Sequence, residues 1–166
     1  MKKILSHLHP FFFALYPILE LRNYNITYVD SAAIVRPILL ALVFTSVIWV
    51  LFRMITHEWQ ISGIFTTLFI IAFFSYGHVF IQIESTTGVM IRHRYLILVY
   101  TAALLLASRA IWFRLKNRGA LINFLTTMGA ILFLYSAFRS VQHDYSVYRS
   151  AQEQRRLTDS PLQQQA

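Results

Sequence analysis

The chain has 166 residues, of which 57% are hydrophobic and 13% charged, whereas soluble domains average roughly 45–50% apolar and about 25% charged residues, so this composition excludes an ordinary soluble domain. The formal net charge of +8 comes mostly from lysines and arginines that flank apolar runs, which indicates membrane topology rather than nucleic-acid binding. The absence of cysteine excludes disulfides, a thiolate nucleophile and cysteine-ligated metal centres.

The amino-terminal apolar segment, residues 4–21, follows two lysines as a signal peptide does. Histidines and prolines interrupt it, and no cleavage site of small residues follows it, so we expect it to be retained. It is just long enough to span a bilayer, but Pro10 and Pro17 leave an interfacial or re-entrant helix as the alternative.

Four further apolar runs have the length of about 17–25 residues that a membrane-spanning helix requires. They are residues 34–55, 59–83, 95–113 and 120–138. The sequence therefore predicts an all-α, multi-pass transmembrane bundle, with five spans or with four spans and an interfacial helix. In the last run, small and polar residues are expected to let helices approach closely and to bond across the interface; they are Asn123, Thr126, Thr127, Gly129 and Ala130.

The remaining residues, 141–166, are polar and rich in glutamine. We expect residues 1–140 to form the membrane bundle and residues 141–166 to form a polar extracytoplasmic tail or linker. A helical continuation to about Arg156 is expected from the charge pattern, and the last ten residues have the composition of a linker.

The positive-inside rule sets the orientation. Six basic residues lie on the side that includes the amino terminus, with Arg109 facing the same side, and four lie in the opposite loops, with Arg139 at the end of the last span. The count is therefore six or seven against five. The first set is Lys2, Lys3, Arg53, Arg114, Lys116 and Arg118, and the second is Arg22, Arg36, Arg92 and Arg94. This bias predicts a cytoplasmic amino terminus and an extracytoplasmic carboxyl terminus in the cell membrane.

One face of the span at residues 59–83 carries polar side chains. Thr67, Ser75, His78 and Gln82 fall on a helical spacing of three and four residues. Such a face is expected to point into the bundle, because lipid offers no hydrogen-bond partners. We interpret it as an intramembrane polar seam between helices.

A second group of polar residues gathers at the outer end of the bundle under this topology. It contains Tyr28 and Asp30 in the first loop, His78 and Glu84 at the end of one span, and Arg92, His93 and Arg94 at the start of the next. Two interpretations remain open for this group: ion pairs that hold the loop in place, or a binding site for lipid phosphates or lipid-linked glycan headgroups.

The sequence gives little support to catalysis, transport or cofactor binding by the chain itself. No Asp or Glu lies in the middle of a span, which argues against a proton-coupled transporter. The topology separates His78 from His7, His9 and His57, which argues against a haem-binding subunit. We therefore expect no catalytic residue, no metal site and no cofactor.

Four strings together resemble a known family. They are HPFFFALYPILELRNYN, the RP at Arg36, FFSYGHVF and RHRYLILV. They look like the amino-terminal membrane module of bacterial membrane-bound sulfatase-like proteins of the alkaline-phosphatase superfamily, and the layout is similar to that of lipoteichoic acid synthases. The resemblance covers residues 9–140, and the matching positions are His9, Pro10, Pro17, Arg36, Pro37, Ser75, Tyr76, Gly77, His78, Arg92, His93, Arg94 and Tyr95.

The resemblance implies a membrane anchor or accessory module that positions an extracytoplasmic sulfatase-like or phosphoglycerol-transferase-like domain or partner. The catalytic Asp, His and nucleophile set of the family belongs to that downstream domain, so no catalytic residue transfers to this sequence. The expected partners are membrane lipids and an extracytoplasmic catalytic domain or protein, with no nucleic acid. The alternative is a small membrane protein that binds lipid or lipid-linked glycan headgroups at its outer face.

Overall fold

The computed structural model describes residues 8–26, 31–88, 92–114 and 117–158, and this part of the chain is helical with no strand. The elements are α2 (His9–Tyr24), a short 3-10 helix η1 (Ser31–Ile34), α3 (Val35–Thr56), α4 (Trp59–Thr87), α5 (His93–Arg114) and α6 (Arg118–Thr158). The prediction of an all-α bundle is confirmed.

Four of the helices are long and apolar enough to cross a membrane, with mean hydropathies between 1.7 and 2.4 in their most apolar windows. The candidate spans are Ala32–Thr56, Trp59–Thr86, His93–Phe113 and Arg118–Arg156. They coincide with the four runs expected from the sequence. The chain is therefore a multi-pass membrane protein.

Helix α2 differs from these spans in length. Its 16 residues extend about 24 Å, which is less than the roughly 30 Å thickness of the hydrocarbon layer. Pro10 lies in its first turn, where a missing N–H group is tolerated. The first part of the segment predicted at residues 4–21 lies outside the described residues. What the structure adds is the position of α2, which packs against α3, α4 and α6 at the centre of the bundle.

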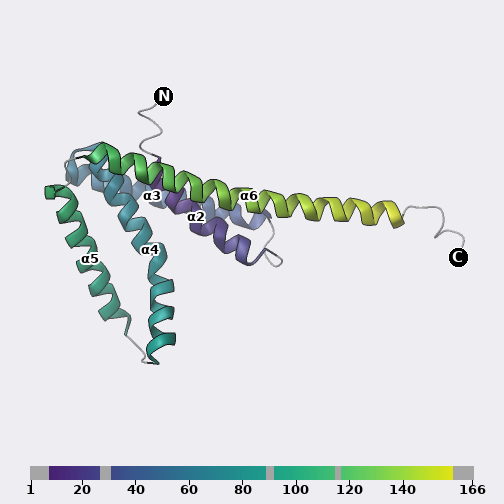
Figure 1. The fold of residues 1–166 in the computed structure, drawn as a ribbon, viewed down its shortest axis with the longest axis horizontal. Coiled ribbons are helices and arrows are strands. Elements are labelled where there is room, and N and C mark those ends of the chain that lie inside the picture. Colours follow the sequence, from purple (N-terminus) through teal and green to yellow (C-terminus); the bar gives the residue numbers. More distant parts are fainter. Residues whose placement is uncertain (1–7, 27–30, 89–91, 115–116, 159–166) are drawn as a thin grey trace, which may run out of the picture.

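The helices form two arms (Figure 1). In the first arm α2 and α6 run in the same direction. The order of their contacts shows this, since Phe12 packs beside Phe133 and the later Asn23 bonds to the later Ser136. Helix α3 returns beside them, and α4 then diverges and pairs with α5 to form the second arm (Figure 1). Helices α3 and α4 are each followed by a residue with positive φ, His57 after α3 and Gly88 after α4. A residue in the left-handed conformation commonly terminates a helix in this way.

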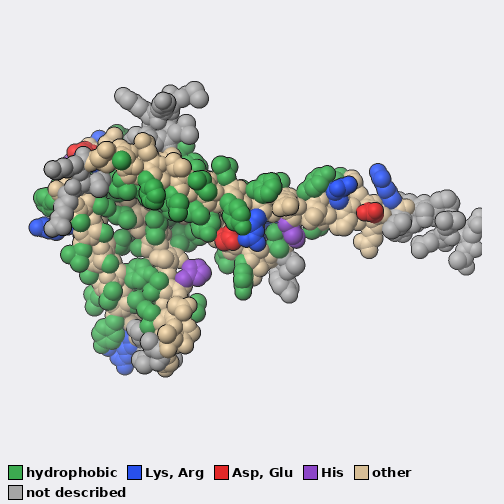
Figure 2. All heavy atoms as spheres, in the orientation of Figure 1, with side chains coloured by type: hydrophobic (Ala, Val, Ile, Leu, Met, Phe, Trp, Pro, Cys, Tyr) green, Lys and Arg blue, Asp and Glu red, His purple; other side chains and the backbone are tan. Residues whose placement is uncertain are grey.

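The buried core is small and lies where α2 meets the other helices. One cluster contains Ala14, Ala41 and Ile70, and a second contains Ile64, Ile122 and Leu125. Most other large apolar side chains are exposed, and they cover the outer surface of both arms (Figure 2). Such an apolar exterior is what a bilayer requires, because lipid tails provide the apolar surroundings that water does not.

Helix α6 continues far beyond the rest of the bundle (Figure 1). It has 41 residues and is therefore about 60 Å long, roughly twice the hydrocarbon thickness. The expected continuation to about Arg156 is confirmed, and the helix passes the proposed boundary at residue 140 without a break. We call residues 141–158 the stalk. Its side chains are mostly polar or charged, as Figure 2 shows towards the carboxyl-terminal end.

Candidate functional site

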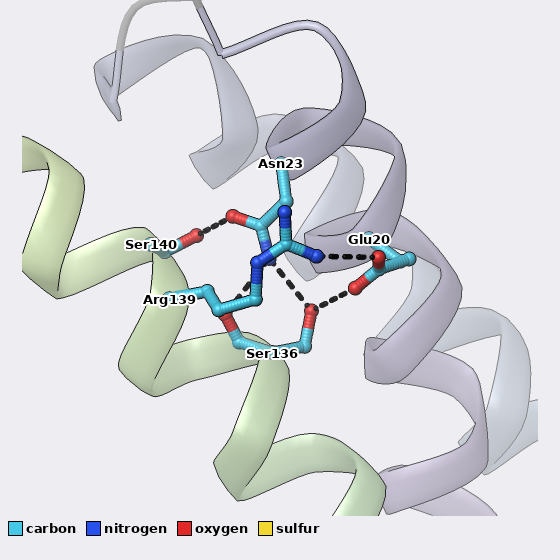
Figure 3. A network of polar contacts seen from close by, with 5 residues as sticks. All are labelled: Glu20, Asn23, Ser136, Arg139 and Ser140. Atoms are coloured by element: carbon cyan, nitrogen blue, oxygen red, sulfur yellow. Dashed lines mark hydrogen bonds and ion pairs between the residues drawn. The ribbon is translucent and has the colours of Figure 1, made fainter.

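A network of polar contacts joins α2 to α6 at the point where the stalk leaves the bundle (Figure 3). The side-chain amide of Asn23 donates to the carbonyl oxygen and to the hydroxyl of Ser136, both at 2.9 Å. The hydroxyl of Ser140 in turn donates to Oδ1 of Asn23 at 2.7 Å. Since all three residues are buried, each of these bonds satisfies a polar group that has no access to water.

Charged residues surround this buried amide. Ser136 donates its hydroxyl hydrogen to Glu20 at 2.9 Å, and the other Glu20 oxygen accepts from Arg139 at 3.1 Å (Figure 3). One turn of α6 further on, the buried guanidinium of Arg22 donates to Asp144 in an ion pair. We call these seven residues, Glu20, Arg22, Asn23, Ser136, Arg139, Ser140 and Asp144, the α2–α6 seam. The seam fixes the base of the stalk.

Helices α2 and α6 also approach each other closely at Gly129, about two turns of α6 before Ser136. A Cβ atom at Gly129 of α6 would lie 3.0 Å from Cβ of Phe12 and 3.1 Å from the ring of Phe13. These separations are shorter than ordinary van der Waals contacts between carbon atoms. The predicted close approach is therefore confirmed at Gly129, where the neighbouring helix is α2, whereas Asn123 and Thr127 of the same set are exposed.

A buried hydrogen bond joins α2 to α4 deeper in the bundle. Nδ1 of His9 lies 2.6 Å from the hydroxyl oxygen of Thr67, and that hydroxyl lies 3.1 Å from the carbonyl oxygen of Gly63. When the Thr67 hydroxyl donates its one hydrogen to this carbonyl, Nδ1 of His9 is the donor to Thr67. This arrangement makes His9 a structural side chain that orients α2 against α4.

A cleft of about 870 Å³ opens between α2 and α4, with one residue of α6 in its wall. Phe13, Phe74, Ile71 and other apolar side chains form most of its surface. Its polar groups come from Tyr16, Glu20 and Tyr24 on α2 and from Ser75 and His78 on α4. A half-open, largely apolar cavity of this size with a few polar groups is typical of small-molecule sites.

The predicted intramembrane seam does not form one interface. Thr67 is buried against α2, whereas Ser75 and the exposed His78 line the cleft. The Ser75 hydroxyl also lies 3.5 Å from the hydroxyl of Tyr100 on α5. Gln82 is exposed and bonds to Thr86 within its own helix. The shared helical face thus points towards α2 and the cleft for most of its length.

The predicted outer cluster is divided. His93 lies on α5, where its Nδ1 is 3.0 Å from the hydroxyl of Tyr76 and its ring stacks on Phe80 at 4.2 Å. Arg94 lies over the ring of Tyr95, and Arg92 is exposed. Among the residues that the structure describes, Glu84 forms no ion pair with Arg92 or Arg94. Tyr28 and Asp30 lie outside the described residues.

At the other end of the bundle, an ion pair joins the start of α6 to the residue before α4. Arg118, the first residue of α6, donates to Glu58 at 2.6 Å, and Glu58 precedes α4. In the described part of the chain, no group of three or more His, Asp or Glu side chains is placed to hold a metal ion.

Sequence reasoning missed the α2–α6 seam. A partial signal was present, because Ser136, Ser140 and Asp144 follow one another at intervals of four residues and so share a face of α6. Their partners on α2 are more than 110 residues away in the sequence, and nothing in the spacing of α2 selects α6 over the other helices.

Comparisons with known proteins add no relationship. The chain matches no family model, and no curated protein or solved structure shows significant similarity to it.

Proposed function

We propose that this chain is a scaffold of the bacterial cell membrane that anchors and positions an extracytoplasmic domain or partner protein and is not an enzyme by itself. The observation that carries this proposal is α6, which spans the bundle and continues as the stalk without a break. A rigid helix transmits position and orientation to whatever is attached to it, whereas a flexible linker does not.

The fixed base of the stalk supports this role. Asn23, Ser136 and Ser140 are buried where α6 leaves α2, and Arg22 pairs with Asp144 just beyond them. Buried hydrogen bonds such as those of the Asn23 amide specify one relative placement of two helices, because sliding or rotation would leave polar groups without partners. The scaffold would therefore hold the stalk in one direction relative to the membrane.

The resemblance to sulfatase-like membrane modules suggests the kind of domain that such a stalk would carry, a sulfatase-like or phosphoglycerol-transferase-like catalytic unit. This assignment requires the carboxyl terminus to be extracytoplasmic and the amino terminus to be cytoplasmic. The basic residues favour that orientation, and α2, α4 and α6 would then run outwards.

The orientation can be tested with single cysteines, because the natural chain has none. Ser150→Cys places a thiol on the stalk, and Gln60→Cys places one near the start of α4, at the other end of the bundle. In intact cells a membrane-impermeant maleimide should label the stalk variant and spare the α4 variant until the cells are lysed. Labelling of the α4 variant alone would refute the scaffold as proposed.

The cleft favours a second function, binding of a lipid or another amphiphile at the outer half of the bundle. An acyl chain would lie along Phe13, Phe74 and Ile71, and a headgroup would lie near Glu20 and His78, which are among the polar lining residues. The aromatic and apolar walls suit a hydrocarbon chain, and the mixed donors and acceptors suit a polar headgroup.

Lipid retention in native mass spectrometry tests this second function. Vesicles of phosphatidylethanolamine and phosphatidylglycerol would supply the lipids before extraction. We expect Ser75→Phe and His78→Leu to lower the bound lipid several-fold, and Gln82→Leu, one turn from His78 and outside the cleft lining, to leave it unchanged. A loss only in the Arg92→Ala, Arg94→Ala double variant would place the headgroup site at the arginines instead.

A further inference from the structure

One face of α6 carries a line of exposed apolar side chains that runs from the bundle into the stalk. They are Phe124, Ile131, Leu134, Phe138, Val141, Tyr145 and Tyr148, and each is between 60% and 65% exposed. With Thr127 between the first two, they follow alternating intervals of three and four residues, which is the spacing of the core positions of a coiled coil. We call this set the α6 stripe.

No other helix that the structure describes covers the α6 stripe. Helix α2 packs on the opposite side of α6, where Gly129, Ser136 and Ser140 lie. At about 100° per residue, these three positions are turned well away from the stripe, and Asp144, which pairs with Arg22, lies between the two sides. The α2–α6 seam therefore fixes α6 in a rotation that presents the stripe outwards.

Only part of the stripe can be explained by contact with lipid. Phe124, Ile131 and Leu134 lie within the predicted span at residues 120–138, where apolar exposure is normal. Val141, Tyr145 and Tyr148 belong to the stalk, beyond the charged Glu20–Arg139 pair. Together with the adjacent Val147, they are the large apolar side chains that the structure describes as exposed in the stalk. A line of such side chains in water indicates an interaction surface.

We infer that two copies of this chain pair through the α6 stripe as a parallel, two-stranded coiled coil. Copies inserted in one orientation bring their α6 helices together in parallel, so each stripe residue meets its own counterpart. The register of the stripe does not change between the bundle and the stalk, which allows one continuous contact over both.

The charges beside the stripe are complementary in this pair. In this coiled coil Val141 and Tyr148 occupy d positions, so Asp144 occupies a g position and Arg149 the following e position. Residues at g and at the following e of the partner helix lie side by side, so Asp144 of one copy faces Arg149 of the other. Asp144 is available for this contact because its side chain is 43% exposed despite its pairing with Arg22. By symmetry the contact occurs twice, and it is attractive both times. Pairing goes beyond the scaffold role and holds whichever side of the membrane the stalk occupies.

Disulfide trapping tests the pairing directly, because the natural chain contributes no thiol. Val141→Cys and Tyr148→Cys place a thiol in the stripe. Ser146→Cys and Ser150→Cys place one at exposed stalk positions turned away from it. In native membranes treated with copper-phenanthroline, we expect several-fold more disulfide-linked homodimer from the stripe variants than from the control variants. Equal linkage at all four positions, or none at any, would overturn the inference.

A measurement on the unaltered chain guards against misfolded variants. Native mass spectrometry from lipid nanodiscs should give twice the 19.4 kDa mass of the chain, and Arg149→Glu, which sets like charges opposite each other, should lower the dimer fraction several-fold. A monomer in the unaltered protein, or a stripe occupied by a different protein, would contradict pairing between copies.

Discussion

Arg22 on α2 donates to the carboxylate of Asp144 on α6, across 122 residues of sequence. The guanidinium is almost completely buried, whereas the carboxylate is partly exposed. This pair lies just beyond the buried Asn23 contacts, so it is the outermost of the described polar contacts between α2 and α6. Its main effect is to satisfy a buried charge, because an unpaired guanidinium in this position would be strongly unfavourable.

Removal of the carboxylate should therefore destabilise the bundle. We expect Asp144→Ala to lower the free energy of unfolding in detergent micelles by about 1–3 kcal/mol, the usual cost of leaving a buried donor without its partner. Glu153→Ala, which removes an exposed carboxylate from the same helix, should change it by less than about 0.5 kcal/mol. Similar losses in the two variants would show that the ion pair contributes nothing specific.

The His9–Thr67 hydrogen bond can be tested against a second buried threonine. Thr67→Val removes the acceptor of the buried His9 N–H group and should cost about 1–3 kcal/mol in thermal or denaturant unfolding. Thr45 is equally buried, and its hydroxyl has no hydrogen-bond partner among the described residues. Thr45→Val should therefore be neutral or stabilising. The reverse order of the two stabilities would contradict the assigned role of His9.

Gly129 lies in a closely packed helix interface, whereas Gly77 lies on an open helix surface. Gly129→Leu inserts a side chain where even a Cβ atom would meet Phe12 and Phe13, so we expect a loss of about 1–3 kcal/mol from overpacking. Gly77→Leu is the matched change on α4, where nothing lies within 4 Å of the added Cβ. It should be neutral or stabilising, since leucine favours a helix more than glycine does. Equal effects on thermal unfolding would show that α2 and α6 are not in close contact at Gly129.

Much of the architecture followed from local properties of the sequence. Uncharged runs bounded by residues such as Arg36, Glu58 and Arg94 predicted the four spans, because a bilayer imposes length and polarity on each helix independently. Gly129 was predicted to allow close approach because the absence of a side chain is a local property. The continuation of α6 followed from its charge pattern.

The partners of each helix could not be predicted in the same way. In a bilayer every apolar face is compatible with lipid, so hydropathy does not select a neighbour for α2. His78 illustrates the consequence: the predicted topology grouped it with Arg92, His93 and Arg94 at the outer end of the bundle, whereas it lines the cleft between α2 and α4. Similarly, Glu20 and Asn23 were not predicted as structural residues, because their bonds depend on packing between α2 and α6.

The continuity of α6 from the bundle into the stalk is the central claim, and a spin–spin distance tests it most directly. Met128→Cys and Glu153→Cys place spin labels on nearly the same face of one helix, 25 residues apart. Double electron–electron resonance in nanodiscs, with excess cysteine-free protein to suppress distances between copies, should give a narrow distribution near 38 Å, from about 1.5 Å per residue. A broad distribution at shorter distances would contradict the account, because it would mean that α6 breaks where it leaves the bundle.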